Sequence, residues 1–192
     1  MIRAIIFDCF GVLTTDGWLA FKAAHFKHDP NLWAQATFLN RQVDSGQITY
    51  DSFVAGIAEL SGVAKAEVHR VVENNAPNEQ IFTALPALKQ QYKIGFLSNA
   101  GDNWLERLFG AERMAMFDVV CLSCDTGFVK PDIRAYEHIA ELLGLEPGEC
   151  VLIDDQQVYV AGAIEASMKA IHYQDFDQTW AELKKLLGST EH

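Results

Sequence analysis

Acidic side chains follow two of the most apolar runs in the chain. Asp8 comes directly after residues 4–7, and Asp154 and Asp155 come directly after the run Cys150–Ile153. Two adjacent carboxylates at the end of a buried strand repel each other unless a cation joins them. Hard oxygen ligands of this kind suit Mg²⁺, which usually binds one or two carboxylates and keeps several of its waters. The acids therefore favour a Mg²⁺ site.

Other polar residues follow the remaining strand-like runs. Ser98 and Asn99 end the run that begins at Lys93, and Lys130 lies just before a helix expected to start near Pro131. Each has an ordinary alternative, because Ser and Asn also favour turns and helix caps and a lone lysine is usually solvated. In an open parallel sheet, however, ligands bind at the carboxyl ends of the strands. Three carboxylates, a lysine and a hydroxyl gathered at that edge favour a reaction site.

These residues share one edge if the strands are parallel, and two alternating patterns in the sequence predict such a sheet. Short apolar runs rich in β-branched residues or phenylalanine alternate with helix-like stretches along most of the chain. That alternation indicates crossover connections and a parallel sheet covered on both faces, and fully apolar strands agree with burial on both sides. We therefore expect an α/β fold, a Rossmann-like parallel sheet sandwiched by helices.

Residues 14–78 interrupt the alternation. They contain no strand-like run, and four stretches among them have helical patterns separated by turns. We therefore expect an inserted α-helical cap at residues 14–78 and a core domain formed by residues 1–13 and 79–192. The aromatic residues of the insert are expected mainly to form its own core, with some lining a substrate pocket. They are Trp18, Phe21, Phe26, Trp33, Phe38 and Phe53.

Composition restricts the possible partners. The 192 residues carry a formal net charge of -11, which disfavours nucleic-acid backbone and anionic membrane because both bind basic patches. No apolar run approaches the roughly 20 residues that span a bilayer. Asp8 interrupts the N-terminal apolar stretch, which therefore reads as a strand and not as a signal peptide, and the four scattered cysteines suit reduced thiols. We expect a cytoplasmic monomer or homodimer that acts on a small-molecule substrate and binds neither nucleic acid nor membrane.

Four short stretches in chain order resemble the motifs of the haloacid dehalogenase-like (HAD) hydrolase superfamily. They are "FDCFGVL" at 7–13, "FLSNA" at 96–100, "GFVKPD" at 127–132 and "VLIDD" at 151–155. The helical segment between the first two is similar to the small α-helical cap of that superfamily, in which "DSGQITYDSF" looks like a common stretch. The resemblance covers nearly the whole chain and implies the fold expected above together with hydrolase activity.

The resemblance implies a role for each acid. Asp8 would be the nucleophile, whose carboxylate forms a covalent aspartyl intermediate that water then hydrolyses. In phosphatase members, Mg²⁺ neutralises the charge between the nucleophile and the phosphoryl group. Its ligands here would be Asp8, the backbone carbonyl of Phe10 and Asp155, with Asp154 as an auxiliary acid.

The other motif residues would act on the substrate. Ser98 would hydrogen-bond a phosphoryl oxygen, and Lys130 would offset developing negative charge and orient Asp8. Asn99 would help to hold the substrate or the loop, and Gly11 would allow the backbone to turn tightly beside a bound ligand. The implied function is a Mg²⁺-dependent phosphatase for a small phosphorylated metabolite.

Phe10 departs from the phosphatase pattern, which usually has a second aspartate at this position. That aspartate protonates the leaving oxygen and then activates water, a role typically worth roughly 10²–10⁴-fold. Phenylalanine keeps the backbone contact to metal but cannot transfer a proton, so water or another residue would have to do so. Tyr159, four residues after Asp155, also stands where a phosphatase often has Asn or Asp.

Two alternatives remain open. Dehalogenases of the superfamily carry an aromatic residue at the position of Phe10 and displace halide from carbon without metal. They usually lack the paired acids of the fourth motif and use an arginine early in the cap, whereas here Arg41 lies some way into the insert and is the only arginine between Arg3 and Arg70. The other alternative is a weakly active or non-catalytic relative that binds a ligand, because Phe10 replaces the acid–base residue.

Overall fold

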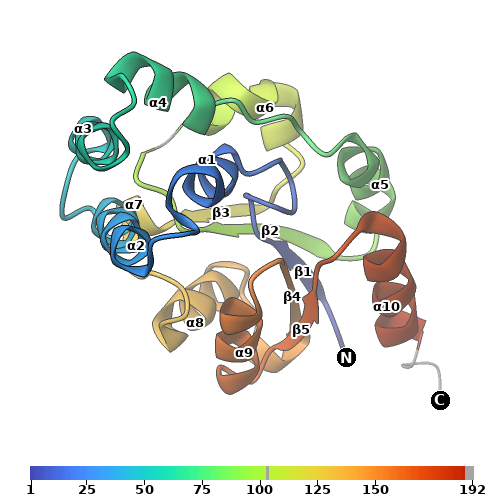
Figure 1. Cartoon of the computed structure of the whole chain (residues 1–192). Helices are drawn as coiled ribbons and strands as arrows, with labels where there is room; N and C mark the ends of the chain where they lie inside the picture. The colour runs from blue at the N-terminus through green and yellow to red at the C-terminus, as the bar shows by residue number, and fades with distance from the viewer. Residues whose placement is uncertain (103, 189–192) are drawn as a thin grey trace.

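Five strands form one parallel sheet in the order β3-β2-β1-β4-β5 (Figure 1), which confirms the expected Rossmann-like α/β fold. The computed structural model describes residues 1–102 and 104–188, so Asn103 and residues 189–192 of the expected core domain lie outside the described residues. The strands are β1 (Ala4–Phe7), β2 (Lys93–Ser98), β3 (Val119–Leu122), β4 (Cys150–Asp154) and β5 (Lys169–His172).

The register of the central strands fixes where the acids leave the sheet. Phe7 of β1 lies opposite Phe96 of β2 and opposite Ile153 of β4. The backbone amide of Asp8 donates to the carbonyl of Ile153 at 2.9 Å, so Asp8 and Asp154 emerge side by side. Because β1 is buried on both faces, its apolar sequence is what a central parallel strand requires.

Helices cover the two faces of the sheet. Ile5 and Phe7 pack with α5 (Glu79–Lys89), α6 (Leu105–Met114) and α10 (Phe176–Gly188). Ala4 and Ile6, which point the other way, pack with α8 (Ile133–Leu142) and α9 (Gln157–Glu165). Two short helices, α7 (Ser123–Thr126) and a 3₁₀ turn at Pro147–Glu149, complete the core. No helix among the described residues is long and apolar enough to cross a membrane.

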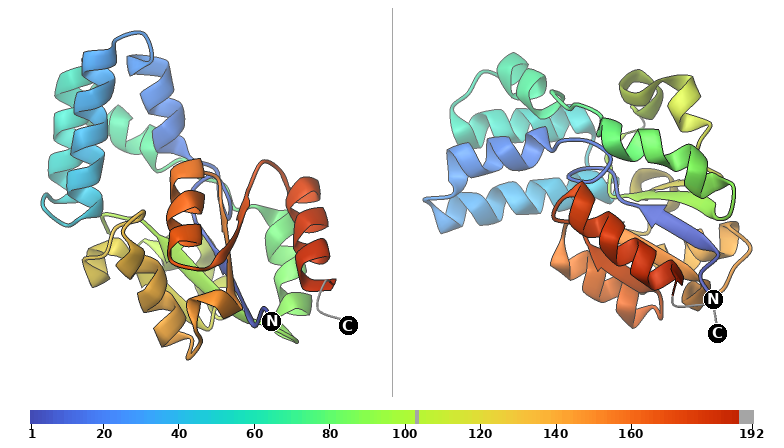
Figure 2. Two further views of the ribbon diagram at one scale, coloured as in Figure 1. Left: turned by 90° about the horizontal axis from the view of Figure 1, so that it is seen from below. Right: turned by 90° about the vertical axis from the view of Figure 1, so that its right-hand side faces the viewer.

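Four further helices follow β1 and share a hydrophobic core of their own. They are α1 (Gly17–Phe26), α2 (Pro30–Asp44), α3 (Tyr50–Ser61) and α4 (Lys65–Val72). Phe21, Phe26 and Phe53 are buried in that core, with Trp18 and Trp33 packed against it. Figure 2 shows these helices as a layer at the end of the sheet opposite the N-terminus. They therefore lie over the carboxyl ends of the strands, where the acids are.

The two chain segments that join the helical layer to the core are paired with each other. The amide of Thr15 donates to the carbonyl of Ala76 at 3.0 Å, and the amide of Ala76 donates to Oγ1 of Thr15 at 2.8 Å. The amide of Gly17, at the start of α1, donates to Oδ1 of Asn75 at 2.9 Å. These contacts hold the two ends of the helical layer together.

Close backbone packing at this joint makes Gly17 sensitive to substitution. A Cβ atom there would lie 2.5 Å from the carbonyl oxygen of Val71 and 2.8 Å from that of Val72. We predict that Gly17→Ala lowers the free energy of unfolding by about 1–3 kcal/mol, as overpacking in well-packed sites typically does. Gly148→Ala is the matched control, because the nearest atom to its Cβ would be the Ser167 carbonyl oxygen at 3.8 Å. Urea denaturation measures both, and equal stabilities would contradict the prediction.

Candidate active site

Three carboxylates meet at the carboxyl ends of β1 and β4. Asp8 follows β1, Asp154 ends β4 and Asp155 follows it. One oxygen from each lies within 4.8 Å of the other two. Asp8 and Asp154 are buried and Asp155 is partly buried. Parallel pairing of β1 with β4 therefore produces the acidic cluster that the sequence pattern predicts.

The side chain of Lys130 is buried between two of these acids. Its Nζ donates to Oδ1 of Asp8 at 2.7 Å and also donates to Oδ2 of Asp154. The Lys130 loop is fixed by Asn99, whose Oδ1 accepts from the Lys130 amide at 2.8 Å and whose Nδ2 donates to the Lys130 carbonyl at 3.0 Å. Asn99 thus positions the loop that brings the lysine to the acids.

The cluster carries more acidic groups than its single ammonium can balance. Burial raises the pKa of Asp8, and the charges of Asp154 and Asp155 raise it further, although Lys130 opposes the shift. Burial alone would lower the pKa of Lys130, but the charges of Asp154 and Asp8 outweigh it and raise that pKa. Burial also raises the pKa of Asp155 to about 6. An added cation would relieve the repulsion among the three acids.

Asp155 has the features of a cation ligand. Its Oδ2 accepts from Nε2 of Gln156 at 2.7 Å, whereas its buried Oδ1 has no hydrogen-bond partner among the described residues. An unpartnered buried oxygen costs free energy unless something binds it. Gly11, at φ +82°, leaves room for this carboxylate, because a Cβ atom there would lie 2.5 Å from Oδ2. Three hard oxygen donors of this kind fit Mg²⁺.

The residues singled out in the sequence fall into two groups. Asp8, Phe10, Ser98, Asn99, Lys130 and Asp155 line a cavity of about 1010 Å³ between the helical layer and the core. Asp154 lies behind Lys130, where its Oδ1 also accepts from the Gln156 amide at 2.9 Å. Gly11 packs closely against the Asp155 carboxylate. Its backbone freedom thus serves the packing of Asp155, while its predicted contact with substrate stays a prediction.

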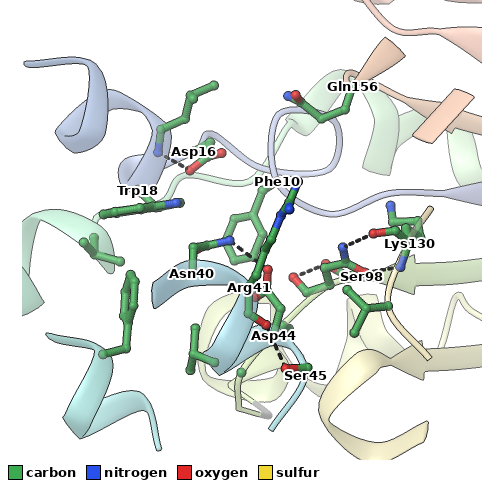
Figure 3. A pocket seen from close by; sticks show the side chains of 18 of the residues that line it. Phe10, Asp16, Trp18, Asn40, Arg41, Asp44, Ser45, Ser98, Lys130 and Gln156 are labelled. Atoms are coloured by element: carbon green, nitrogen blue, oxygen red, sulfur yellow. Dashed lines mark hydrogen bonds between the residues drawn. The ribbon is translucent and has the colours of Figure 1, made fainter. Parts of the chain in front are cut away.

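Figure 3 shows that side chains of the helical layer also lie in this cavity, among them residues that were not predicted as site residues from the sequence. Asn40 and Asp44 of α2 and Asp16 ahead of α1 all line it. Asp44 is the first residue of the stretch "DSGQITYDSF", but helical spacing says nothing about which face of a helix meets a distant strand end, so the sequence does not place either acid in the site. Arg41 also lines the cavity, so its position far along the insert does not remove it from the site.

Comparisons with known proteins identify the family of this chain. A family profile for haloacid dehalogenase-like hydrolases matches residues 2–167. The chain is 32% identical over 193 residues to the sesquiterpene phosphatase astK of Aspergillus oryzae, covering 97% of each chain. It is 30% identical over 187 residues to phosphatase MT3486 of Mycobacterium tuberculosis, covering 88% of this chain and 86% of that protein.

Solved structures agree at the level of fold. A HAD family enzyme from Bacteroides thetaiotaomicron, solved with magnesium and inorganic phosphate, superposes with a TM-score of 0.72 at 22% identity, covering 93% of this chain and 98% of that one. The family profile covers most of the chain, and the matches to the two phosphatases cover most of the length of each relative. The four quoted stretches bring the acids and the lysine together at one site. The chain belongs to the haloacid dehalogenase-like hydrolases.

Proposed function

We propose that this hydrolase is a Mg²⁺-dependent phosphatase that acts on a small phosphorylated metabolite through covalent attack by Asp8. The observation that carries the proposal is the buried contact of 2.7 Å between Asp8 Oδ1 and Lys130 Nζ, with Asp154 and Asp155 beside it. A carboxylate held next to a fixed cation is suited to attack an anionic group whose charge must be offset. Two matched relatives are named as phosphatases.

Each side chain has a defined part in the proposed reaction. Asp8 attacks phosphorus and is phosphorylated, the leaving oxygen departs, and water then releases phosphate from Asp8. Lys130 orients Asp8 and offsets negative charge on the phosphoryl oxygens, and the hydroxyl of Ser98 donates to one of them. Bound by Asp8, Asp155 and the carbonyl of Phe10, with Asp154 as auxiliary acid, Mg²⁺ would neutralise the charge that separates carboxylate from phosphoryl group.

Apolar side chains around the cavity favour a substrate with an apolar organic group. Leu19, Phe38 and Val158 line the cavity although they are 40%, 61% and 56% exposed, and Trp18 and Trp104 also line it. Apolar side chains gathered in the open around a cavity are typical of a binding site. The Aspergillus relative is named for a sesquiterpene, which is an apolar group. We propose a phosphomonoester with a bulky apolar group.

The proposed partners and location of the protein follow from its substrate class, net charge and cysteines. Neither nucleic acid nor membrane is needed as a partner, since the substrate is a small molecule and the net charge is -11. All four cysteines are free thiols, which supports a reducing, cytoplasmic location. A monomer or a homodimer is compatible with a cavity built from one chain.

The metal-free dehalogenase alternative has one observation in its favour, the presence of both Phe10 and Arg41 at the cavity. Three carboxylates within 4.8 Å of one another oppose it. Displacement of halide from carbon by a lone aspartate requires no such repulsive cluster. A divalent cation bound among the three carboxylates would make the cluster favourable. We therefore favour phosphate transfer.

The proposed function predicts Mg²⁺-dependent release of phosphate that Asp8→Asn abolishes. The amide is nearly the same size as the carboxylate but is a far weaker nucleophile, so turnover should fall below detection while the thermal midpoint of unfolding stays within a few degrees. A panel of phosphomonoesters and 2-haloacids, assayed for phosphate and chloride with Mg²⁺ and with EDTA, makes the measurement. Chloride release in EDTA would contradict the proposal, and so would Mg²⁺ binding without turnover of any ester.

The proposed substrate class predicts a selective effect of Phe38→Ser. Removal of an apolar contact worth about 1–2 kcal/mol should lower kcat/KM roughly 5- to 30-fold for an ester with a branched C15 chain, and leave a sugar phosphate unaffected. Ile164→Ser is the matched control, since Ile164 is 58% exposed on α9, outside the cavity lining. An equal loss for both esters, or a wild-type preference for sugar phosphates, would show the apolar class to be wrong.

A further inference from the structure

Phe10 leaves the proposed reaction without a proton carrier at its usual place. Its ring lines the cavity and packs on Trp104, with ring centroids 4.9 Å apart. It therefore fills the position with apolar surface. An alkoxide leaving group still requires a proton, and the water that releases phosphate from Asp8 must still lose one.

We propose that Asp44, at the end of α2, is the general acid and base of this reaction. The proposal rests on the proposed phosphatase function, which it deepens by naming the residue that moves the proton. Asp44 belongs to none of the four motif-like stretches, although it is the first residue of the cap stretch "DSGQITYDSF". Its place in the cavity follows from the fold.

The Asp44 side chain is buried in the cavity that holds the reacting acids. It lines the same cavity as Asp8 and Phe10, and it is 8% exposed. The charge of Lys130, whose Nζ is 2.7 Å from Asp8 Oδ1, opposes the rise in the pKa of the Asp44 carboxyl that burial causes. The charge of Asp44 in turn raises the pKa of Tyr159, whose ring is centred 5.0 Å from Lys130 Nζ. Asp44 therefore shares the cavity with Asp8 and interacts electrostatically with the groups around Lys130.

The end of α2 is anchored to the core through Ser123, which also contacts the loop that follows Ser98. The hydroxyl of Ser123 donates to the Asp44 carbonyl at 2.6 Å and accepts from the amide of Ala100 at 3.0 Å. Gly101 packs so closely on α2 that a Cβ atom there would lie 2.3 Å from Cγ2 of Val43. A residue that must meet a reacting atom needs such a fixed support, and none of these contacts involves the Asp44 carboxyl itself.

The surroundings of the Asp44 carboxyl suit proton transfer in both directions. Its Oδ2 accepts from Nδ2 of Asn40 at 2.8 Å (Figure 3), which holds the group in one orientation. Burial raises the pKa of Asp44 to about 7, against the opposing effects of Lys130 and Asn40. A carboxyl group with a pKa near the working pH gives and takes a proton with similar ease, which is the condition for general acid–base catalysis.

The proton balance of the two steps is complete. As Asp8 bonds to phosphorus and the phosphorus–oxygen bond of the ester breaks, the Asp44 carboxyl gives its proton to the leaving oxygen, and the alcohol departs. The Asp44 carboxylate then takes a proton from the water that attacks phosphorus, while the bond between phosphorus and Asp8 breaks. Phosphate is released, and both Asp8 and Asp44 return to their starting states.

Asp16 is the competing acid, because it too lines the cavity. Its carboxylate is occupied as the N-cap of α1, where Oδ1 accepts from the amide of Leu19 at 2.7 Å. Protonation of Asp16 would weaken that cap, whereas protonation of Asp44 leaves its acceptor for Asn40 intact. Asp16→Asn, which keeps an N-cap residue, is therefore the matched control variant.

The test compares two esters that differ in their need for an acid. 4-Nitrophenyl phosphate has a leaving group that is stable as an anion, whereas hexyl phosphate has one that must be protonated. In Asp44→Asn, steady-state turnover of hexyl phosphate should fall by about 10²–10⁴-fold. With 4-nitrophenyl phosphate, Asp44→Asn should release a burst of about one nitrophenolate per chain and then turn over slowly, because phosphorylation of Asp8 needs no acid but its hydrolysis needs a base.

The outcomes separate the possible failures. A wild-type protein that hydrolyses neither ester would overturn the proposed function and this inference together. If the wild-type protein is active, two results for Asp44→Asn would overturn the inference alone: unchanged turnover of both esters, or an equal loss of turnover for both without a burst. A burst in Asp16→Asn and not in Asp44→Asn would overturn it too. If Asp44→Asn does not fold, Asp44→Ser, which also keeps an acceptor for Asn40, takes its place in the same assay.

Discussion

The buried ammonium of Lys130, held between Asp8 and Asp154, is the interaction on which the site depends. Removing charges from water is costly, and the cost is recovered only with good geometry and hydrogen bonds. Here the geometry comes from three separate parts of the fold: the end of β1, the end of β4 and the Lys130 loop clamped by Asn99. Each part would be misplaced without the others, so sheet pairing and site geometry are one constraint.

That interaction also sets the charge requirement of the site. Lys130 balances part of the charge of Asp8 and Asp154, and Asp155 remains with a buried oxygen that no described residue satisfies. A further cation would satisfy that oxygen and relieve the repulsion, which is the physical reason for proposing Mg²⁺ here. In the proposed reaction a substrate phosphoryl group would bring negative charge to the same place, so the ammonium and the cation would serve binding and reaction alike.

The parts of the site that could be predicted from sequence are those attached to strand ends. Asp8, Ser98 and Asp155 each follow an apolar run, and parallel pairing brings such residues to one edge whatever the loops do. Lys130 lies in a loop after another such run, and its role beside Asp8 is implied only by motif resemblance. Even within a motif, the sequence does not predict every contact. Gly11 is required because its backbone packs closely on Asp155, and a single sequence does not reveal which two residues pack together.

The helical layer could be predicted as an element but not as a set of contacts. Its helices have clear periodicity, yet the face of α2 that meets the core depends on how the whole layer is seated. Ser123 and Gly101 decide that seating, and neither carries a signal in the sequence. The fold is therefore what shows that Asp44 lines the cavity, and it also decides that Arg41 and Phe38, both considered from the sequence, reach it. Substrate choice depends on the same contacts, which explains why motifs identify the family more readily than the substrate.

The most direct test of the mechanism is to detect phosphate on Asp8 itself. Wild-type protein turning over 4-nitrophenyl phosphate with Mg²⁺ is quenched in acid within milliseconds, and its peptides are weighed by mass spectrometry. The proposed mechanism predicts one added phosphoryl group on the peptide that contains Asp8, lost on treatment with hydroxylamine. Turnover with the phosphoryl group on another residue, or with none on Asp8 at any sampled time, would contradict covalent catalysis by Asp8.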